Sequence, residues 1–260
     1  MEFMLFLLLG AAAGLLAGLF GVGGGLIIVP VLVFAFTAQG FEAELLTHMA
    51  VGTSLASIIF TSLSSAYAHH KKGALNMAVV LPMAFGTIVG SALGAWTAGA
   101  ISGPALQKII GIFALLMALQ IALDLRPKAS GGLPGTAGLS AAGGVIGWAA
   151  AIFGIGGGSL SVPFLLWRGQ SMQQAVAVSA ACGLPIALSG ALSFAVLGSQ
   201  AGALPNWSLG YIYLPALLGI ALLSVPFAKL GANLAHRLPQ LLLKRLFALL
   251  LLSVGLKFLL

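Results

Sequence analysis

Charged side chains are scarce in this sequence. Only 6% of its 260 residues are Asp, Glu, Lys or Arg, whereas a soluble domain contains roughly 25%. Hydrophobic residues make up 60% of the chain, and the mean hydropathy is +1.15. Apolar runs long enough to cross a bilayer recur along it. The composition excludes a soluble protein and predicts an all-α polytopic membrane protein, with the lipid bilayer as its surroundings.

Acidic residues and cysteine are scarcer still. The four carboxylates are those of Glu2, Glu42, Glu44 and Asp124, and none lies deep in an apolar run. Because a buried carboxylate is the usual intramembrane proton carrier or sodium ligand, this argues against a cation pump or channel. The single cysteine, Cys182, excludes an intramolecular disulfide and a cysteine-based metal cluster. With no catalytic triad, metal-ligand spacing or P-loop ending, we expect no enzyme activity, no cofactor and no metal.

Glycine is abundant, and two matched glycine segments organise the chain. Residues 20–32 read FGVGGGLIIVPVL and residues 153–165 read FGIGGGSLSVPFL, at an offset of 133 residues. Three consecutive glycines disfavour a helix and open backbone angles closed to other residues. A short helix that begins after them has N–H groups without intrahelical partners, which attract an anion. Close helix packing is the alternative use of such glycines.

The duplication predicts two repeats: residues 1–125, a linker over 126–136, and residues 137–260. Each would contain a Gly-rich broken or re-entrant helical hairpin and three transmembrane helices. The predicted spans are about 3–20, 45–68, 75–100, 105–123, 137–153, 173–197, 209–235 and 239–260, with short helices over 26–36 and 159–167.

Basic residues sit in the short connections, so the net charge of +7 reads as a topology signal and no nucleic-acid partner is expected. If each glycine segment is re-entrant, the repeats are inverted and nine Lys or Arg residues fall on one side against two, Lys108 and Lys257, on the other. That is the positive-inside pattern. We expect both termini outside and the linker and basic loops in the cytoplasm. The nine are Lys71, Lys72, Arg126, Lys128, Arg168, Lys229, Arg237, Lys244 and Arg245.

The inverted arrangement places the substrate where the two glycine hairpins meet, near the middle of the membrane. Hydroxyls on one face of the 45–68 span could line the same route, or bond to neighbouring helices and their own carbonyls. His48 is a candidate for proton coupling, with an interfacial position as the alternative. The candidate substrate-binding residues are Gly23, Gly24, Gly25, Gly156, Gly157, Gly158, Ser159, Ser161, Thr53, Ser54 and Ser57.

The paired glycine motifs, the Ala50-Val51-Gly52-Thr53-Ser54 element and the total length resemble the TauE/SafE family of sulfite and organosulfonate membrane permeases. The resemblance covers essentially the whole chain. It implies a secondary transporter for small sulfur-containing anions such as sulfite or sulfonates, in a prokaryotic cell inner membrane. The second half carries Ala180-Ala181 in place of Thr53-Ser54, so we expect the first half to supply more of the hydroxyl ligands.

Two alternatives remain open from the sequence: a passive anion channel and a non-transporting membrane scaffold. The scaffold accounts for the small residues but not for two matched glycine breaks. The sequence does not specify the anion, the direction of transport, the coupling ion or the oligomeric state.

Overall fold

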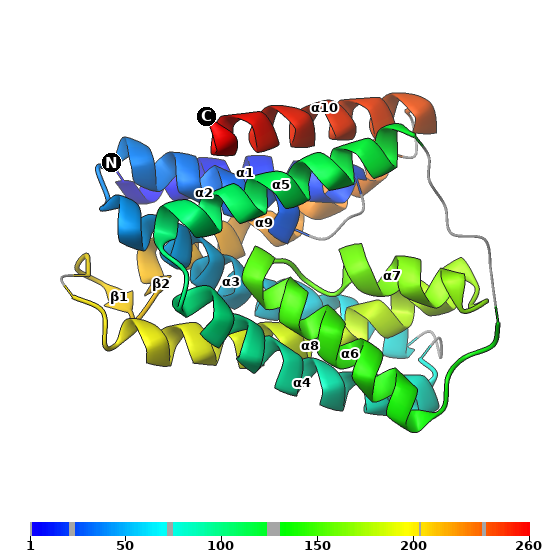
Figure 1. Cartoon of the computed structure of the whole chain (residues 1–260). Helices are drawn as coiled ribbons and strands as arrows, with labels where there is room; N and C mark the ends of the chain where they lie inside the picture. Colours follow the sequence, from blue (N-terminus) through cyan, green and yellow to red (C-terminus); the bar gives the residue numbers. More distant parts are fainter. Residues whose placement is uncertain (1, 21–23, 72–74, 124–130, 203, 236–237) are drawn as a thin grey trace.

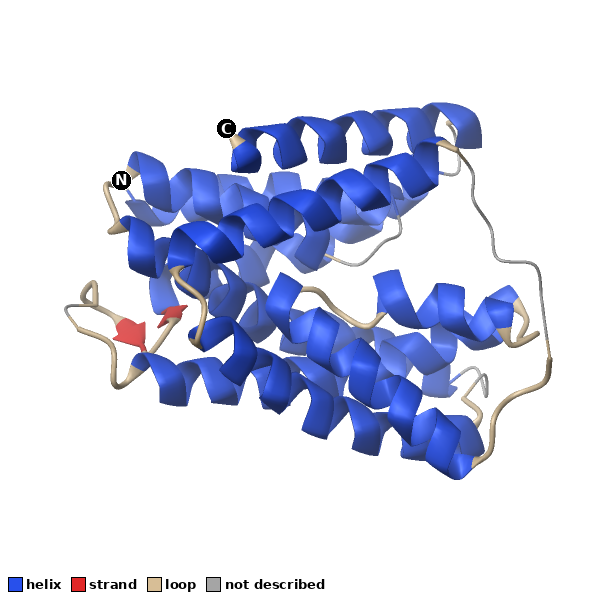
Figure 2. Cartoon of the chain, viewed as in Figure 1, coloured by secondary structure: helices blue, strands red, loops and turns tan. Residues whose placement is uncertain are grey.

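A computed structural model describes residues 2–20, 24–71, 75–123, 131–202, 204–235 and 238–260. The described chain is almost entirely helical, with one small β-hairpin at the edge (Figures 1 and 2). The elements are α1 (Glu2–Phe20), α2 (Gly25–Ala38), α3 (Ala43–Lys71), α4 (Met77–Gly99), α5 (Gly103–Ala122), α6 (Thr136–Phe153), α7 (Gly158–Trp167), α8 (Met172–Gly198), β1 (Ser208–Leu209), β2 (Ile212–Tyr213), α9 (Leu214–Ala235) and α10 (Gln240–Leu259).

The predicted membrane spans are largely confirmed. Seven of the described helices, α1, α3, α4, α5, α6, α8 and α9, are long and apolar enough to cross a membrane. The helix α10 forms where the eighth span was predicted, but it contains three basic residues, Lys244, Arg245 and Lys257. The short helices α2 and α7 follow the two glycine segments, as predicted.

The predicted span over 209–235 is wrong at its start. Residues 208–213 form the antiparallel hairpin β1–β2, and α9 begins only at Leu214. Gly210 has φ +55 and Trp207 has φ +66, so the chain turns here through left-handed conformations. These conformations interrupt a helix whatever the hydropathy of the side chains.

Each glycine segment joins two helices that run in opposite directions. In Figure 1 α6 runs inward from one end of the molecule, and α7 returns from the interior to that same end. The pair α1 and α2 does the same from the opposite end, where the N-terminus lies (Figure 1). The remaining long helices cross the molecule, and the C-terminus lies at the end where α1 begins (Figure 1).

The two halves of the chain interlock. The first helix of each half packs along a helix of the other half: α1 against α9, and α6 against α4. Small residues permit these close crossings. A Cβ built on Gly14 would lie 2.4 Å from the Ser224 carbonyl oxygen, and one on Gly90 would lie 2.0 Å from that of Gly144. In the centre α3 packs against α8, and at one side α5 packs against α10.

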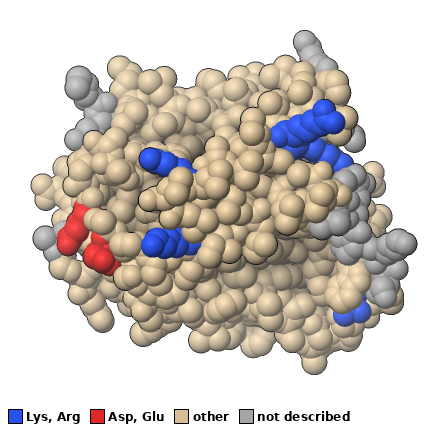
Figure 3. Space-filling view, turned by 45° about the horizontal axis from the view of Figure 1, so that its top comes forward, with Lys and Arg blue, Asp and Glu red and all other residues tan. Residues whose placement is uncertain are grey.

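The outer surface suits a hydrocarbon environment. Large apolar side chains are exposed on several long helices, including Phe85, Trp96, Leu192 and Leu222. Figure 3 shows a face on which charged side chains are few and separated by a broad uncharged area. The described basic residues Lys71, Arg168, Lys244 and Arg245 lie at or next to helix ends on the side where α3 ends and α8 begins, and Lys229 lies in the last two turns of α9.

Candidate functional site

The two glycine breaks meet in the centre of the molecule. A Cβ built on Gly25, the first residue of α2, would lie 2.5 Å from the Ile155 Cα and 2.6 Å from the Gly154 carbonyl oxygen. Gly154 ends α6 in the left-handed conformation, with φ +64. The Ser54 hydroxyl, near the middle of α3, donates a hydrogen bond of 2.8 Å to the Gly154 carbonyl. The breaks therefore lie level with the middle of a crossing helix.

The short helices α2 and α7 begin at these breaks. The first hydrogen bonds of α7 run from Leu160 and Ser161 to the Gly157 carbonyl, and those of α2 run from Ile27 and Ile28 to that of Gly24. The N–H groups of the preceding glycines thus have no acceptor within the helix. Each helix N-terminus carries a partial positive charge of about half a unit.

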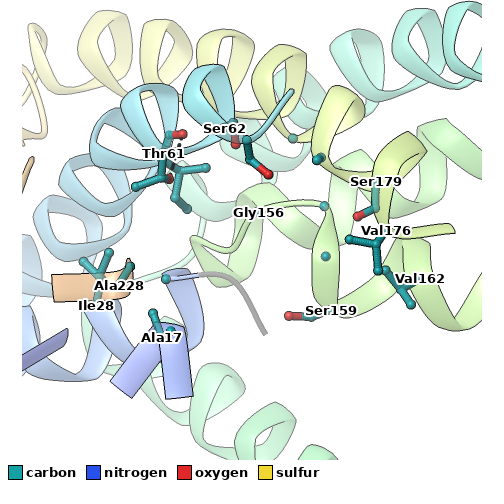
Figure 4. A pocket seen from close by; sticks show the side chains of 18 of the residues that line it. Ala17, Ile28, Thr61, Ser62, Gly156, Ser159, Val162, Val176, Ser179 and Ala228 are labelled. Atoms are coloured by element: carbon teal, nitrogen blue, oxygen red, sulfur yellow. Dashed lines mark hydrogen bonds between the residues drawn. The ribbon is translucent and has the colours of Figure 1, made fainter. Parts of the chain in front are cut away.

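A cavity of about 530 Å³ lies beside the breaks. Its lining comes from α1, α2, α3, α5, the α6–α7 turn, α7, α8 and α9, which Figure 4 shows surrounding it. The contributing parts of α3 and α8 are the end of α3, from Ile58 to Ser65, and the start of α8, from Met172 to Gly183. The cavity therefore extends from the glycine breaks toward the end of the molecule where α3 ends and α8 begins.

Hydroxyl groups without protein partners line this cavity. Ser179 of α8 is 2% exposed and Ser224 of α9 is 3% exposed, and neither hydroxyl has a hydrogen-bond partner. Figure 4 shows the Ser179 hydroxyl pointing toward the glycine segment at Gly156. The Ser161 hydroxyl is also buried and unpartnered, 3.3 Å from a Cβ built on Gly157. A buried hydroxyl with no partner costs free energy, and a bound acceptor would satisfy it.

Five of the predicted binding residues line the cavity: Gly24, Gly156, Gly157, Gly158 and Ser159. Five others do not: Gly25, Ser161, Thr53, Ser54 and Ser57. The remaining one, Gly23, lies outside the described residues.

The predicted hydroxyls in the first part of α3 make structural contacts. Thr53 is fully buried and its Oγ1 accepts a hydrogen bond of 2.9 Å from the Tyr213 N–H. The Ser57 hydroxyl donates to the Ser54 carbonyl at 2.7 Å. The Thr53 contact holds the β-hairpin against α3, and the Ser54 contact with Gly154 holds the second glycine break there, whereas the Ser57 bond lies within α3. The alternative use of hydroxyls, bonding to neighbouring helices and to the helix backbone, describes them here.

His48 lies far from the cavity, at the opposite end of α3. Its Nδ1 is 3.0 Å from the Glu44 carbonyl oxygen, and its Nε2 is 3.0 Å from that of Ala98 and 3.1 Å from that of Ile101. The two Nε2 contacts join α3 to the end of α4 and to the α4–α5 connection. Ten residues of helix separate His48 from Ile58, about 15 Å.

Aromatic side chains fill the end of the molecule near His48. The His48 ring stacks on Tyr211 with centroids 5.1 Å apart. Tyr213 lies between Phe6, Phe36 and Phe41, with centroid distances of 5.8, 5.7 and 5.3 Å. Desolvation raises the pKa of the Tyr211 phenol, so the group stays neutral here. This packing contrasts with the open cavity on the other side of the breaks.

The polar lining residues that were not among the predicted binding residues are Thr61, Ser62, Ser65, Gln120, Ser179 and Ser224. A weak signal existed for several of them: Thr61 continues the periodic hydroxyl face of α3, and Ser179 lies on the matching helix of the second half. Half of these polar groups, Gln120, Ser179 and Ser224, come from α5, α8 and α9. The two halves contribute equal numbers of lining hydroxyls, and the expectation that the first half supplies more of the hydroxyl ligands stays a prediction.

Interlocked helices, two central helix breaks and a cavity that extends from them toward one end are an arrangement suited to a membrane transporter. The family model for the sulfite exporter TauE/SafE matches residues 6–258, and the chain belongs to this family. It is 40% identical to a probable membrane transporter protein of Haemophilus influenzae over 97% of this chain and 96% of that protein. It is 28% identical to a probable membrane transporter protein of Methanocaldococcus jannaschii, over 91% and 89% of the two chains.

Proposed function

We propose that the protein is a secondary transporter of small sulfur-containing anions, sulfite or an organosulfonate, which it moves by alternating access. The observation that carries the proposal is the juxtaposition of two half-helix N-termini with a cavity lined by unpartnered hydroxyls. The N–H groups at a helix N-terminus and side-chain hydroxyls are donors, and an oxyanion is an acceptor that can satisfy several of them together.

The binding site in this proposal centres on the second glycine break. Gly156, Gly157 and Gly158 supply N–H groups at the start of α7, and Ser179 supplies a hydroxyl from α8. Gly24 brings the start of α2 to the same cavity. Ser54 acts indirectly, because its hydroxyl holds the α6–α7 turn in place at Gly154, whereas the Ser57 hydroxyl bonds within its own helix.

The proposed architecture is a pair of inverted repeats, residues 1–125 and 137–260, joined by a linker over 126–136. The opposite directions of α1 and α6 support it, as does the presence of both termini at one end (Figure 1). The described basic residues at the ends of α3 and α7, in the last two turns of α9 and at the start of α10 favour placing the opposite end, where α3 ends and α8 begins, in the cytoplasm of a prokaryotic cell, with the protein in its inner membrane. The cavity would then face the cytoplasm.

One-sided access favours a carrier over a channel. The described lining residues lie on one side of the breaks, while the Tyr213 aromatic cluster fills the other. A carrier must close one side before it opens the other, and His48 lies at the closed end. Proton coupling through His48, if it operates, would act on this closure and not directly on the anion.

The test is uptake of sulfite by purified protein in proteoliposomes, with Gly156→Leu as the diagnostic variant. A Cβ on Gly156 would meet only the Ile58 side chain, at 3.4 Å, so a leucine can extend into the cavity without a backbone clash. We expect uptake to fall at least about tenfold, since a leucine removes volume where the anion binds. The matched control is Gly202→Ala, where a Cβ would meet nothing within 4 Å.

Several outcomes would count against the proposal. Wild-type uptake by the folded Gly156→Leu protein would overturn the binding site. Flux without trans-stimulation by sulfite on the opposite side would indicate the channel alternative. Absence of both uptake and binding for sulfite and sulfonates would favour the scaffold.

A further inference from the structure

The described lining of the cavity contains no charged side chain. Gln120 is the lining residue with the strongest side-chain dipole, and the other polar contributors are hydroxyls and glycine backbone. The helices α2, α6, α7 and α8 contain no Asp, Glu, Lys or Arg in their sequences. The charged residues of the lining helices α3, α5 and α9, namely Glu44, Lys71, Lys108 and Lys229, are not among the lining residues. Within the described lining, the sources of positive potential are therefore the N-termini of α2 and α7, which together amount to about one unit of charge.

This electrostatic design discriminates between anions by their charge. The attraction of an anion to fixed dipoles grows in proportion to its charge, whereas the cost of removing its hydration grows with the square of that charge. For a doubly charged anion, the hydration free energy lost on entering the cavity thus exceeds the attraction that the two helix N-termini provide. A singly charged anion needs only the donors that are present.

The unpartnered hydroxyls agree with this reasoning. Ser179 and Ser224 are buried, line the cavity and have no acceptor in the protein. They can stabilise one delocalised negative charge by hydrogen bonding, but they carry no charge with which to neutralise a second one. Proteins that hold doubly charged oxyanions commonly provide Arg or Lys for that purpose.

We propose that the site selects singly charged oxyanions and rejects doubly charged ones, so that it takes hydrogen sulfite or a simple sulfonate rather than the sulfite or sulfate dianion. This inference rests on the proposed function and specifies the substrate class of the same site. It predicts that transport of inorganic sulfite depends on pH through protonation of the substrate.

The first experiment compares methanesulfonate with sulfate, which share a tetrahedral sulfur head but differ by one charge. Binding is followed as the rise in apparent melting temperature of the detergent-purified protein at matched ionic strength. Sulfate also stabilises proteins non-specifically by exclusion from their surface, so the shift of Gly156→Leu is subtracted for each anion. We expect methanesulfonate to bind at least about tenfold more tightly, which corresponds to about 1.4 kcal/mol.

A variant that adds a positive charge to the cavity sharpens this test. Gln120→Lys adds a cation to the lining and should raise the affinity for sulfate relative to methanesulfonate by about tenfold. Gln120→Met is the uncharged control of similar length and should leave the preference unchanged. A preference that does not respond to the lysine would overturn the electrostatic explanation.

The second experiment measures uptake into proteoliposomes at zero membrane potential between about pH 6 and about pH 8, where histidine also titrates. Sulfite uptake should fall several-fold as pH rises and hydrogen sulfite loses its proton. Methanesulfonate keeps one charge throughout, so its uptake reports any pH dependence that comes from the protein and not from the substrate. None of the described histidines lines the cavity.

The results separate the inference from the proposed function. Equal binding of sulfate and methanesulfonate, or parallel pH profiles for sulfite and methanesulfonate, would overturn charge selection while leaving anion transport intact. Failure of every anion to bind or to be taken up would overturn both.

Discussion

The two glycine breaks have nearly the same sequence but different surroundings. At the first break, Gly25 is buried against the backbone of Ile155 and Gly154. At the second break, Gly156, Gly157 and Gly158 line the cavity. The positions Gly25 and Gly154 have no room for a side chain, whereas Gly156 has ordinary van der Waals space around a Cβ.

This difference distinguishes two uses of glycine, close backbone packing and lining of the cavity, that the sequence pattern alone does not distinguish. Close packing explains Gly25 and Gly154, which let the two breaks touch. It does not explain Gly156, where an alanine would fit. We therefore interpret the first break mainly as the support against which the second one is held, and the second as the wall that faces the ligand.

The largest expected effect is loss of folded protein when the contact between the breaks is disturbed. In Gly25→Ala the new Cβ meets backbone atoms of Ile155 and Gly154, which cannot move aside as a flexible side chain could. In Gly154→Ala the left-handed φ of +64 adds conformational strain. We expect each change to destabilise the protein by about 3 kcal/mol.

The measurement is the apparent melting temperature together with the monodisperse fraction on size exclusion in detergent. Gly202→Ala, in open space, is the control for alanine substitution itself. A Gly25→Ala protein as stable as this control would show that the two breaks are not packed as closely as described.

The second prediction contrasts two buried serines. Ser54→Ala removes the donor to the Gly154 carbonyl and should lower stability by about 2 kcal/mol, because that carbonyl is left unsatisfied. Ser179→Ala removes a hydroxyl that has no protein partner, so stability should change by less than about 0.5 kcal/mol. It should weaken anion binding about tenfold, the value of a hydrogen bond to a charged group.

Paired melting curves with and without methanesulfonate give both quantities for each variant. The contrast fails if Ser179→Ala binds the anion as the wild type does, or if Ser54→Ala is as stable as the wild type. Either result would mean that the presence or absence of a protein hydrogen-bond partner does not distinguish a serine that stabilises the fold from one that binds the anion.

Much of the fold follows from the sequence because hydropathy and glycine dominate a membrane protein. The seven long apolar helices and the short helices after each break were predicted from these two signals. The hairpin before α9 was not, because its turn depends on backbone conformations at Trp207 and Gly210 within an apolar stretch. Hydropathy does not report such a turn.

The lining of the cavity was predictable only in part. The periodicity of Ser54, Ser57 and Thr61 places them along one face of α3, but it does not say which part of that face the other half of the chain covers. Packing against Gly154 and Tyr213 covers the first part, so only the later part, around Thr61 and Ser62, lines the cavity. That division is decided by contacts between residues about 100 or more positions apart.

The smallest expected effects test whether the two breaks contribute unequally to binding. A Cβ on Gly24 would meet the end of the Ile28 side chain at 2.8 Å, within its own helix, whereas one on Gly156 would lie in ordinary contact with Ile58. We expect Gly156→Ala to weaken methanesulfonate binding by about threefold. This is below the tenfold or more that a misplaced methylene can cost in a closed pocket, because the cavity has about 530 Å³ in which the ligand can shift.

Gly24→Ala should change the affinity less than Gly156→Ala, since the added methyl group is accommodated by movement of Ile28. Isothermal titration of both variants with methanesulfonate makes the comparison directly, and equal melting temperatures confirm that folding is unaffected. A larger loss in Gly24→Ala would reverse the assignment, because it would mean that the start of α2, and not the start of α7, lies nearer the bound anion.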